Sequence, residues 1–310
     1  MNRQIKRKPD PCAYNEGMSE RPVYMPKLTR PFYTIENYEF DWAPGQAAAQ
    51  KKKNSAELRS LWKEKHPGQS ILEVSTKSDS PAGEKLSPFN LTKRLKSLRK
   101  EFPVENIYQA AKTFRHGGPY VDLLGAAPNK ALADPRLLDS GPLVSFTMEN
   151  EQYPATPVWL FYTWLYLSAL LENPGLADTV RKTDAFCDIE FNPNKGVNNQ
   201  ARACAVFHSL ARLGLLEQAK SFEGFKAIMM AEDISEIKEQ SKKQEGPQDL
   251  SQMRSEVRRQ SFPVGSWIVH PGIGTGEVIR RTPTSYVIRF RVAGPKTLTK
   301  DFVETHCKRA

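Results

Sequence analysis

Residues 104–112 read Val-Glu-Asn-Ile-Tyr-Gln-Ala-Ala-Lys, and this stretch is the most informative part of the chain. It follows Phe102-Pro103, where the proline is well placed to open a helix, and no helix breaker occurs until a later pair of glycines. A helix here places Glu105, Gln109 and Lys112 at i, i+4 and i+7, on one face. A carboxylate, an amide and an amine on one face can bind a polar ligand and move protons. A solvated amphipathic helix shows the same pattern, so the neighbouring segments must decide between a ligand-binding face and a solvated face.

The charge of the chain is unevenly distributed. The 310 residues carry a formal net charge of +10. Residues 256–310 hold ten Lys and Arg against four Asp and Glu, whereas residues 1–26 hold five against three. An excess of positive charge suggests a polyanionic partner, and the basic character belongs mostly to the C-terminal end.

The cysteines and the apolar segments indicate the cellular compartment of the protein. The four cysteines are widely spaced, with no C-x-x-C pair and no histidine at ligand spacing, so neither a disulfide framework nor a zinc site is expected. We expect a cytoplasmic protein without a metal or another cofactor. The N-terminus lacks the apolar core of a secretory signal, and the most apolar run, residues 158–171, is too short to span a bilayer. No membrane association is therefore expected.

The order of the segments predicts an α+β domain, a linker and a small β-domain. Residues 1–20 are expected to be a disordered tail, and residues 21–220 the first domain. Residues 221–258 are charged and low in aromatics, which is typical of a solvated helical linker. Residues 259–310 contain short strands separated by Gly and Pro turns, which indicates a β-barrel of SH3 or Tudor type.

Within the first domain, hydrophobic periodicity and turn residues place the main elements. Helices are expected at residues 47–65, 91–101, 157–171 and 200–213, strands at 38–42, 70–75 and 143–148, and loops at 79–85 and 183–198.

Three loops carry polar side chains suited to ligand binding. Residues 86–90 (Leu-Ser-Pro-Phe-Asn) place an aromatic ring beside short hydrogen-bonding groups. Residues 184–188 (Asp-Ala-Phe-Cys-Asp) put two carboxylates around another aromatic ring. Residues 192–200 are rich in amides and lead into a helix N-terminus, a place that favours anions such as phosphate.

These segments together resemble a known family. Residues 104–114 resemble the helix motif of the NADAR family, whose members are N-glycosidases associated with NAD and ADP-ribose. Residues 86–89 are similar to the family's Phe-Ser-Asn-Phe element. Residues 184–186 and 194–198 are similar to its late Asn-Asp-Ala-Tyr-Trp-Gly and Gly-Lys-Gly-x-Asn segments. The motifs occur in the family's order.

Departures from the family pattern bear on the substrate. Pro88 stands where the family has Asn, and Cys187-Asp188 stand where it has Trp-Gly, so the pocket is expected to differ from that of the family's riboflavin-intermediate hydrolases. Residues 117–120 and 188–193 look most like those of NADAR antitoxins paired with guanine-specific DNA ADP-ribosyltransferase toxins. The resemblance implies a helix-rich α+β domain that acts as such an antitoxin.

The activity implied by the resemblance is cleavage of the N-glycosidic bond between ADP-ribose and the exocyclic amine of guanine. Glu105 would be the general acid and base, with a pKa raised if the pocket is dry. Lys77 or Lys112 could instead attack the opened sugar and hold it as a Schiff base, although either is equally well an ordinary solvated lysine. Asp184 would bind ribose hydroxyls or stabilise the developing cation.

Substrate binding is expected from side chains in and beside these motifs. Phe89, Tyr120 or Phe186 would stack on the base, and Asn198 with the adjoining helix start would hold the diphosphate. Asp188 can equally cap a loop, and Tyr108 is also a candidate core residue. The full set of expected substrate-binding residues is Ser87, Phe89, Asn90, Tyr108, Gln109, Gly118, Tyr120, Phe186, Asp188 and Asn198.

The C-terminal module offers a second kind of binding surface. Residues 267–272, followed by Gly274-x-Gly276, look like the Tudor-like modules of bacterial transcription and DNA-repair proteins. Its cations would suit salt-sensitive, sequence-neutral phosphate contacts, although a protein-docking module whose charges are solvated fits as well. The expected nucleic-acid-binding residues are Arg280, Arg281, Arg289, Arg291, Lys296 and Lys300.

The leading hypothesis is therefore a metal-independent hydrolase that removes ADP-ribose from guanine in DNA modified by a partner toxin. Its partners would be ADP-ribosylated DNA and a cognate ADP-ribosyltransferase toxin. Two alternatives stay open. One is a non-catalytic adaptor that binds ADP-ribose or the toxin, and the other is an N-glycosidase of a small nucleotide intermediate.

Overall fold

The computed structural model describes residues 18–45, 47–191, 198–231, 262–270, 273–282, 285–299, 303 and 307–309. The chain divides into two compact units, residues 1–238 and 239–310. The predicted N-terminal tail lies outside the described residues up to residue 17, and the first strand already begins at Met18. Most of the predicted linker, Lys300 and the core of the predicted phosphate loop at residues 192–197 also lie outside them.

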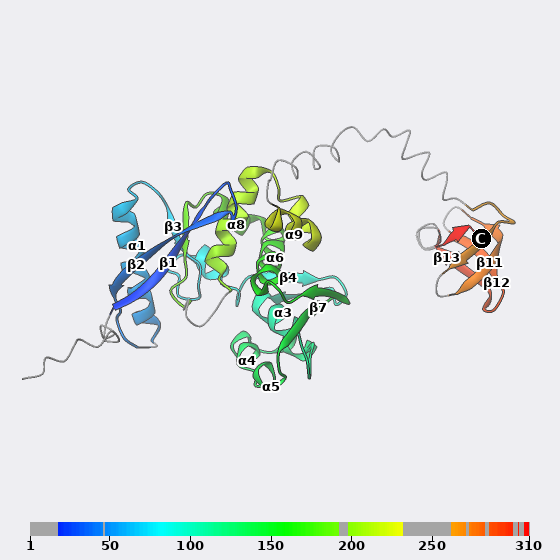
Figure 1. Ribbon diagram of the computed structural model, residues 1–310, viewed down its shortest axis with the longest axis horizontal. Helices are drawn as coiled ribbons and strands as arrows, with labels where there is room; N and C mark the ends of the chain where they lie inside the picture. Colours follow the sequence, from blue (N-terminus) through cyan, green and yellow to red (C-terminus); the bar gives the residue numbers. More distant parts are fainter. Residues whose placement is uncertain are drawn as a thin grey trace, which may run out of the picture. The chain divides into compact units, whose positions relative to one another are not determined.

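The first unit is a helix-rich α+β domain, as the sequence predicts (Figure 1). Its strands are β1 (Met18–Pro26), β2 (Tyr33–Asp41), β3 (Ile71–Glu73), β4 (Thr92–Leu95), β5 (Lys100–Pro103), β6 (Lys112–Phe114), β7 (Leu143–Met148), β8 (Glu151–Pro154) and β9 (Ala185–Cys187). Its helices are α1 (Ala48–Lys65), α2 (Pro81–Lys85), α3 (Val104–Ala111), η1 (Val121–Gly125), α4 (Pro128–Leu132), α5 (Arg136–Asp139), α6 (Val158–Glu172), α7 (Pro174–Arg181), α8 (Gln200–Leu213), η2 (Gln218–Lys220) and α9 (Phe222–Met230).

A four-stranded sheet in the order β2-β1-β9-β3 lies between α1 and α8 (Figure 1). Successive strand residues point to opposite faces of a sheet. Val23 of β1 packs with Leu58 and Trp62 of α1, whereas its neighbour Tyr24 joins the main core with Phe186 of β9. The short strand β9 is central to this sheet, and its side chains are buried on both faces.

Helix α6 is the centre of the main core and carries α3. Side chains from Leu160 to Leu170 are buried around the whole helix, which agrees with the apolar run seen in the sequence. The ring of Tyr108 on α3 lies 5.4 Å from that of Phe146 and 5.2 Å from that of Tyr162 on α6. These aromatic contacts fix α3 against α6, and with it the face that carries Glu105.

The predicted basic helix at residues 91–101 is wrong. This segment forms most of the antiparallel hairpin β4–β5, which continues to Pro103. Leu91 and Leu95 are buried with Phe102. The spacing of the two leucines fits one face of a helix, but it also fits alternate residues of a strand, and pairing with β5 selects the strand.

Three further boundaries differ from expectation. Helix α3 ends at Ala111, and the chain continues as β6 because Lys112 and Thr113 pair with Phe146 and Ser145 of β7. Residues 81–85 form the helix α2 rather than a loop. Strand β9 lies within the predicted loop at 183–198, and it forms because it pairs with β1 and β3. Such short strands depend on partners distant in sequence, so local patterns do not reveal them.

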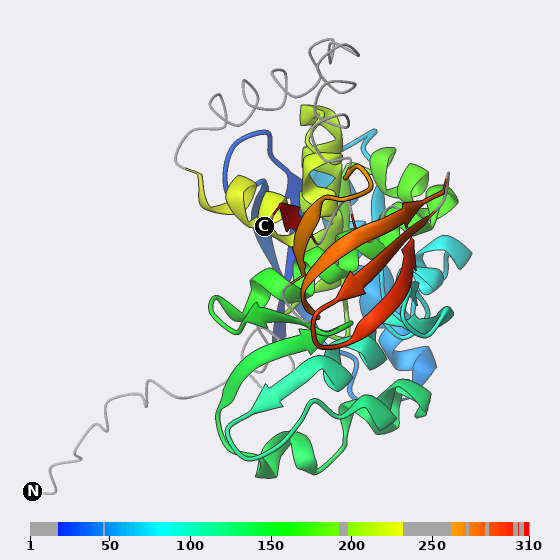
Figure 2. The same cartoon turned by 90° about the vertical axis from the view of Figure 1, so that its right-hand side faces the viewer.

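The strands that the structure describes in the second unit form one antiparallel sheet, which agrees with the predicted all-β class. Figure 2 shows the antiparallel strands of its sheet in orange and red. The strands are β10 (Trp267–His270), β11 (Gly274–Arg281), β12 (Ser285–Phe290), β13 (Gly294–Thr299) and β14 (Lys308–Arg309), in the order β13-β12-β11-β10-β14. Ile268, Val278 and Ile288 are enclosed in its core. A Cβ at Gly276 would come within 2.7 Å of the Ile288 side chain, so a glycine is required there. No helix within the described residues has the length and apolarity needed to cross a membrane.

Candidate active site

A cavity of about 840 Å³ opens in the first unit beside the face of α3 that carries Glu105. This volume lies in the range of sites for small molecules and cofactors. The cavity is lined by Lys51, Thr76, Lys77, Ser87, Pro88, Phe89, Glu105, Tyr108, Gln109, Lys112, Leu132, Tyr162, Asp188, Glu190, Phe191, Asn198 and Gln200.

One wall of the cavity is a hydrogen-bonded row of three side chains, two on α3 and one just after its end. Gln109 donates from Nε2 to Oε1 of Glu105 at 2.7 Å, and Lys112 donates from Nζ to Oε1 of Gln109 at 2.6 Å. The Lys112 Nζ also lies 4.8 Å from the centre of the Tyr108 ring. The expected helix face is therefore present, although Lys112 itself has left the helix.

Burial controls the proton affinity of this row. Glu105 is only 6% exposed, and desolvation raises the pKa of its carboxyl above the ordinary value despite the Gln109 hydrogen bond. Desolvation lowers the pKa of the Lys112 amine, against the opposing effect of the nearby Glu105 charge. A carboxyl group that holds its proton beside an amine that releases its proton more easily is suited to acid–base and nucleophilic chemistry.

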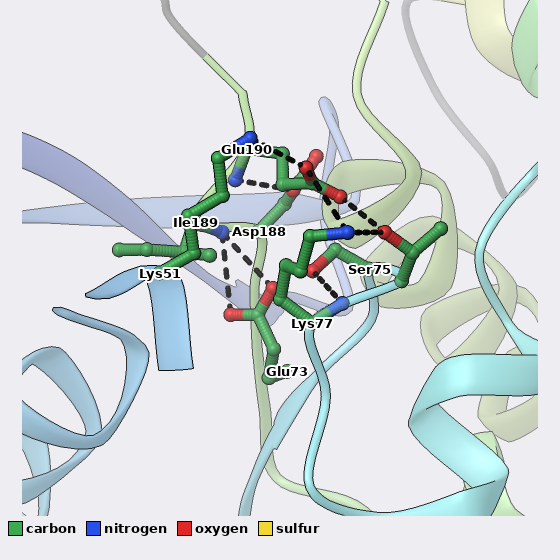
Figure 3. Close-up of polar contacts among 8 residues, drawn as sticks. Lys51, Glu73, Ser75, Lys77, Asp188, Ile189 and Glu190 are labelled. Carbon is green, nitrogen blue, oxygen red and sulfur yellow. Dashed lines mark hydrogen bonds and ion pairs between the residues drawn. The ribbon is translucent and has the colours of Figure 1, made fainter. Parts of the chain in front are cut away.

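A second wall includes the buried Asp188, and the buried carboxyl group of Glu73 lies behind it and bonds to the neighbouring Ile189 (Figure 3). Glu73, at the end of β3, accepts hydrogen bonds from the backbone N of Ile189 at 3.0 and 3.2 Å and from Cys187 Sγ at 3.2 Å. Asp188 accepts one from the backbone N of Glu190 at 3.0 Å. Burial raises the pKa of both carboxyl groups, and the Glu73 charge raises that of Asp188 further.

Lys77 and Lys51 both reach Glu190 at the edge of this wall (Figure 3). Their Nζ atoms lie 3.9 and 3.0 Å from Glu190 Oε1. Thr76 completes the group, because its hydroxyl donates to Glu190 Oε2 at 2.7 Å and accepts from Lys77 Nζ at 2.6 Å. The Lys77 amine is therefore held between the Thr76 hydroxyl and the Glu190 carboxylate.

The third wall is the start of α8. Asn198 donates from Nδ2 to the hydroxyl of Tyr108 at 2.7 Å, and Asn199 caps the helix by accepting from the backbone N of Arg202 at 3.0 Å. Asn198 Oδ1, Asn199 Nδ2 and Arg202 Nη2 are buried and make no hydrogen bond to the residues that the structure describes. A helix N-terminus with unpaired donors is suited to an anion.

A comparison with models of protein families shows the family to which this chain belongs. The model of a family described as DarT1-associated NADAR antitoxin matches residues 19–239. The chain belongs to this family. No curated protein matches it. The match confirms the resemblance seen in the sequence, and membership makes the protein an antitoxin of the NADAR type with a cognate toxin as its partner.

The structure of the NADAR antitoxin brings together most of the residues expected from its sequence. The cavity is lined by Lys77, Ser87, Phe89, Glu105, Tyr108, Gln109, Lys112, Asp188 and Asn198. The ring of Tyr108 packs in the core, and its hydroxyl accepts from Asn198 at the cavity. Asp188 likewise both caps the loop to Glu190 and lines the cavity.

Asp184 and Phe186 are not brought to the cavity. Asp184 lies at the surface, where its Oδ2 accepts from the backbone N and the hydroxyl of Ser70, each at 2.8 Å. The ring of Phe186 is enclosed in the main core on the α8 side of the sheet. Phe186 lies within the buried strand β9, whereas Asp188 follows the end of that strand and lines the cavity.

Asn90, Gly118 and Tyr120 also lie away from the cavity lining. Asn90 is exposed and donates to the backbone O of Glu84 at 2.9 Å. Tyr120 bonds to Ser140, and a guanidinium packs on its ring at 4.5 Å. Gly118 has φ +82°, and a Cβ there would lie 2.3 Å from the backbone O of Lys112, so this glycine is required by the close approach of two segments.

Several residues that line the cavity of the antitoxin were not predicted from the sequence. Lys51, Tyr162 and Gln200 come from three different helices, α1, α6 and α8. Glu190 and Phe191 belong to the segment 188–193, whose resemblance to the toxin-paired branch was a usable signal. No local pattern marked Lys51, which lies among solvated lysines of an unremarkable surface helix.

Proposed function

We propose that this antitoxin works in the cytoplasm as an N-glycosidase that removes ADP-ribose from guanine bases of DNA modified by its toxin. The observation that carries the proposal is the row Glu105–Gln109–Lys112 on the wall of the cavity. Family membership supports the antitoxin role, and the row supplies the groups that the cleavage needs.

Glu105 has the properties of a general acid. Cleavage of the C1″–N bond sends its electron pair to the leaving guanine nitrogen, and Glu105 supplies the proton that this nitrogen takes up. Positive charge develops on the ribose carbon. A water oxygen then bonds to that carbon and returns a proton to Glu105, which restores the starting state. The raised pKa of Glu105 keeps the proton available for the first step.

Lys112 offers a covalent variant of the same reaction. Its Nζ would bond to C1″ of the opened sugar while the bond to the guanine nitrogen breaks and Glu105 protonates the leaving nitrogen. Water then hydrolyses the resulting imine, which releases ADP-ribose and frees the amine. The lowered pKa of Lys112 favours this variant at Lys112 over Lys77, whose amine is paired with Glu190.

The remaining walls suit the rest of the ligand. We assign the diphosphate to the start of α8, where Asn198 and Gln200 line the cavity. Phe89 is one of the aromatic residues that line the cavity, and we assign it to the guanine base. We assign Asp188 to the ribose hydroxyls.

The test is release of ADP-ribose from an oligonucleotide ADP-ribosylated on guanine, followed by chromatography and mass spectrometry. Wild type is expected to release it, and Glu105→Gln is expected to be strongly impaired. Glu84→Gln is the matched control, because Glu84 is an exposed glutamate outside the cavity lining.

Each other outcome selects an alternative. Tight binding of ADP-ribose without release by the wild type would support the non-catalytic adaptor. Release from free ADP-ribosylguanosine but not from the oligonucleotide would support a small-molecule N-glycosidase. Equal release by wild type and Glu105→Gln would remove Glu105 from the mechanism.

A further inference from the structure

Strand register divides the basic side chains of the C-terminal sheet between its two faces. Paired residues on neighbouring strands share a face. Arg281 pairs with Tyr286 and Lys296 pairs with Ile288, and both partners belong to the buried core. Arg280, in contrast, pairs with Val287, which lies between those buried residues and points the other way. Five described cations therefore do not form one surface, although they look alike in the sequence. They are Arg280, Arg281, Arg289, Arg291 and Lys296.

The outward face is defined by Trp267, Val269, Glu277, Arg280, Arg289 and Arg291. Trp267 pairs with Glu277, which pairs in turn with Arg289, so these three cross the sheet in one row. Arg291 follows β12, and its guanidinium lies 4.9 Å from the centre of the Trp267 ring. Trp267 is 41% exposed although it is the largest apolar side chain of the unit.

The chemistry of this face selects its ligand. An exposed indole flanked by arginines attracts flat, electron-rich rings that carry negative charge nearby. A cationic ligand is disfavoured, because the positive charge of the Arg291 guanidinium beside the indole ring would repel it. Three arginines against one glutamate complement a phosphate backbone.

We propose that the outward face of the C-terminal sheet binds single-stranded nucleic acid, with Trp267 stacking on an unpaired base while Arg289 and Arg291 contact phosphates. Duplex DNA fits less well, since its bases are already stacked and paired. The inference goes beyond the proposed hydrolysis and does not depend on it. Neither Trp267 nor the division of the cations between two faces follows from the composition of the segment.

The experiment measures binding of the full chain to a labelled, unmodified oligonucleotide by fluorescence anisotropy. Single-stranded DNA, single-stranded RNA and duplex DNA of one sequence are compared, so that the two sources of unpaired bases are distinguished from each other and from the duplex. Single strands are expected to bind more tightly than the duplex. Trp267→Ala is expected to weaken single-strand binding about tenfold, and Trp267→Phe to retain most of it.

Matched charge variants test the face. Arg289→Gln and Arg291→Gln are expected to weaken binding and to lessen its dependence on salt, because each removes one phosphate contact. Arg281→Gln and Lys296→Gln remove the same charge from the other side of the sheet and are expected to change binding less than twofold. Glu277→Gln is expected to tighten binding, because it removes the carboxylate from the middle of the face.

Several results would overturn the proposal. These are absence of binding, tighter binding of the duplex, unchanged binding by Trp267→Ala, or equal losses in all four charge variants. Binding of an acidic protein partner in place of the oligonucleotides would likewise contradict it. If Trp267→Ala fails the folding check by circular dichroism, Arg291→Gln and Glu277→Gln, with their opposite expected effects, decide the question.

Discussion

Gln109 Nε2 lies 2.7 Å from Glu105 Oε1, one helical turn away on the same face of α3. The same amide accepts from Lys112 at 2.6 Å. One neutral side chain therefore connects the buried carboxyl group of Glu105 to the half-buried amine of Lys112 and keeps the two apart. This arrangement lets each group be tested separately.

Replacing Glu105 by Gln should lower kcat by about 10²- to 10⁴-fold, the usual contribution of a general acid. Glutamine keeps the shape and a hydrogen bond to Gln109 but has no proton to give. The Kd for ADP-ribose, measured by calorimetry, should change only a few-fold. A large loss of ADP-ribose binding with kcat retained would instead make Glu105 a binding residue.

Replacing Gln109 by Ala should move the pH profile of kcat to higher pH. The acid must be protonated to act, so the rate falls as pH rises through the pKa of Glu105. The Gln109 hydrogen bond lowers that pKa, and its removal therefore extends activity upward in pH. The measurement is kcat against pH for both proteins. An unchanged or downward-shifted basic limb would contradict this role of Gln109.

Borohydride reduction during turnover should trap ADP-ribose on Lys112 if the covalent variant operates. Burial lowers the pKa of the Lys112 amine, whereas the amine of Lys77 is held by Glu190 and Thr76. Peptide mass spectrometry locates the adduct. Lys112→Met should abolish it, and Lys77→Met should preserve it. An adduct on Lys77, or none in wild type, would reassign or remove the nucleophile.

The buried pair Glu73 and Asp188 should make the fold less stable as pH rises. Burial raises their folded pKa values above the unfolded values of about 4, so the stabilisation is complete below about pH 4. It is lost as pH rises through the raised folded values. Urea unfolding at pH 5 and pH 8 measures the loss, which should be smaller in Asp188→Asn. A variant with the full wild-type loss would show that Asp188 does not contribute.

Replacing Asp184 by Ala should leave kcat unchanged within about twofold, because its carboxylate binds Ser70 at the surface rather than the ligand. The lost hydrogen bonds should lower the free energy of unfolding by about 1 kcal/mol. Activity assays and urea unfolding check both points. A loss of kcat comparable with that of Glu105→Gln would return Asp184 to the reaction.

The sequence alone was sufficient for those features that depend on local pattern. The apolar run at residues 158–171 predicted the buried helix α6, and the position of Pro103 predicted the start of α3. Spacing along that helix then placed Glu105 and Gln109 on one face, because helical geometry is the same in any protein. The motifs in their order indicated the NADAR family, and alternating apolar residues indicated the C-terminal strands.

Tertiary structure decided what depends on partners distant in the chain. Pairing of β9 with β1 and β3 determines that Asp188 faces the cavity while Asp184 stays at the surface. The carboxylate of Glu190 pairs with a lysine from α1 and with another from the loop after β3. The spacing of these residues in the sequence does not predict this contact. Register likewise separates Arg289 from Arg281 in the C-terminal sheet. A shift of one residue reverses every side chain of a strand, and only the assembled sheet selects the register.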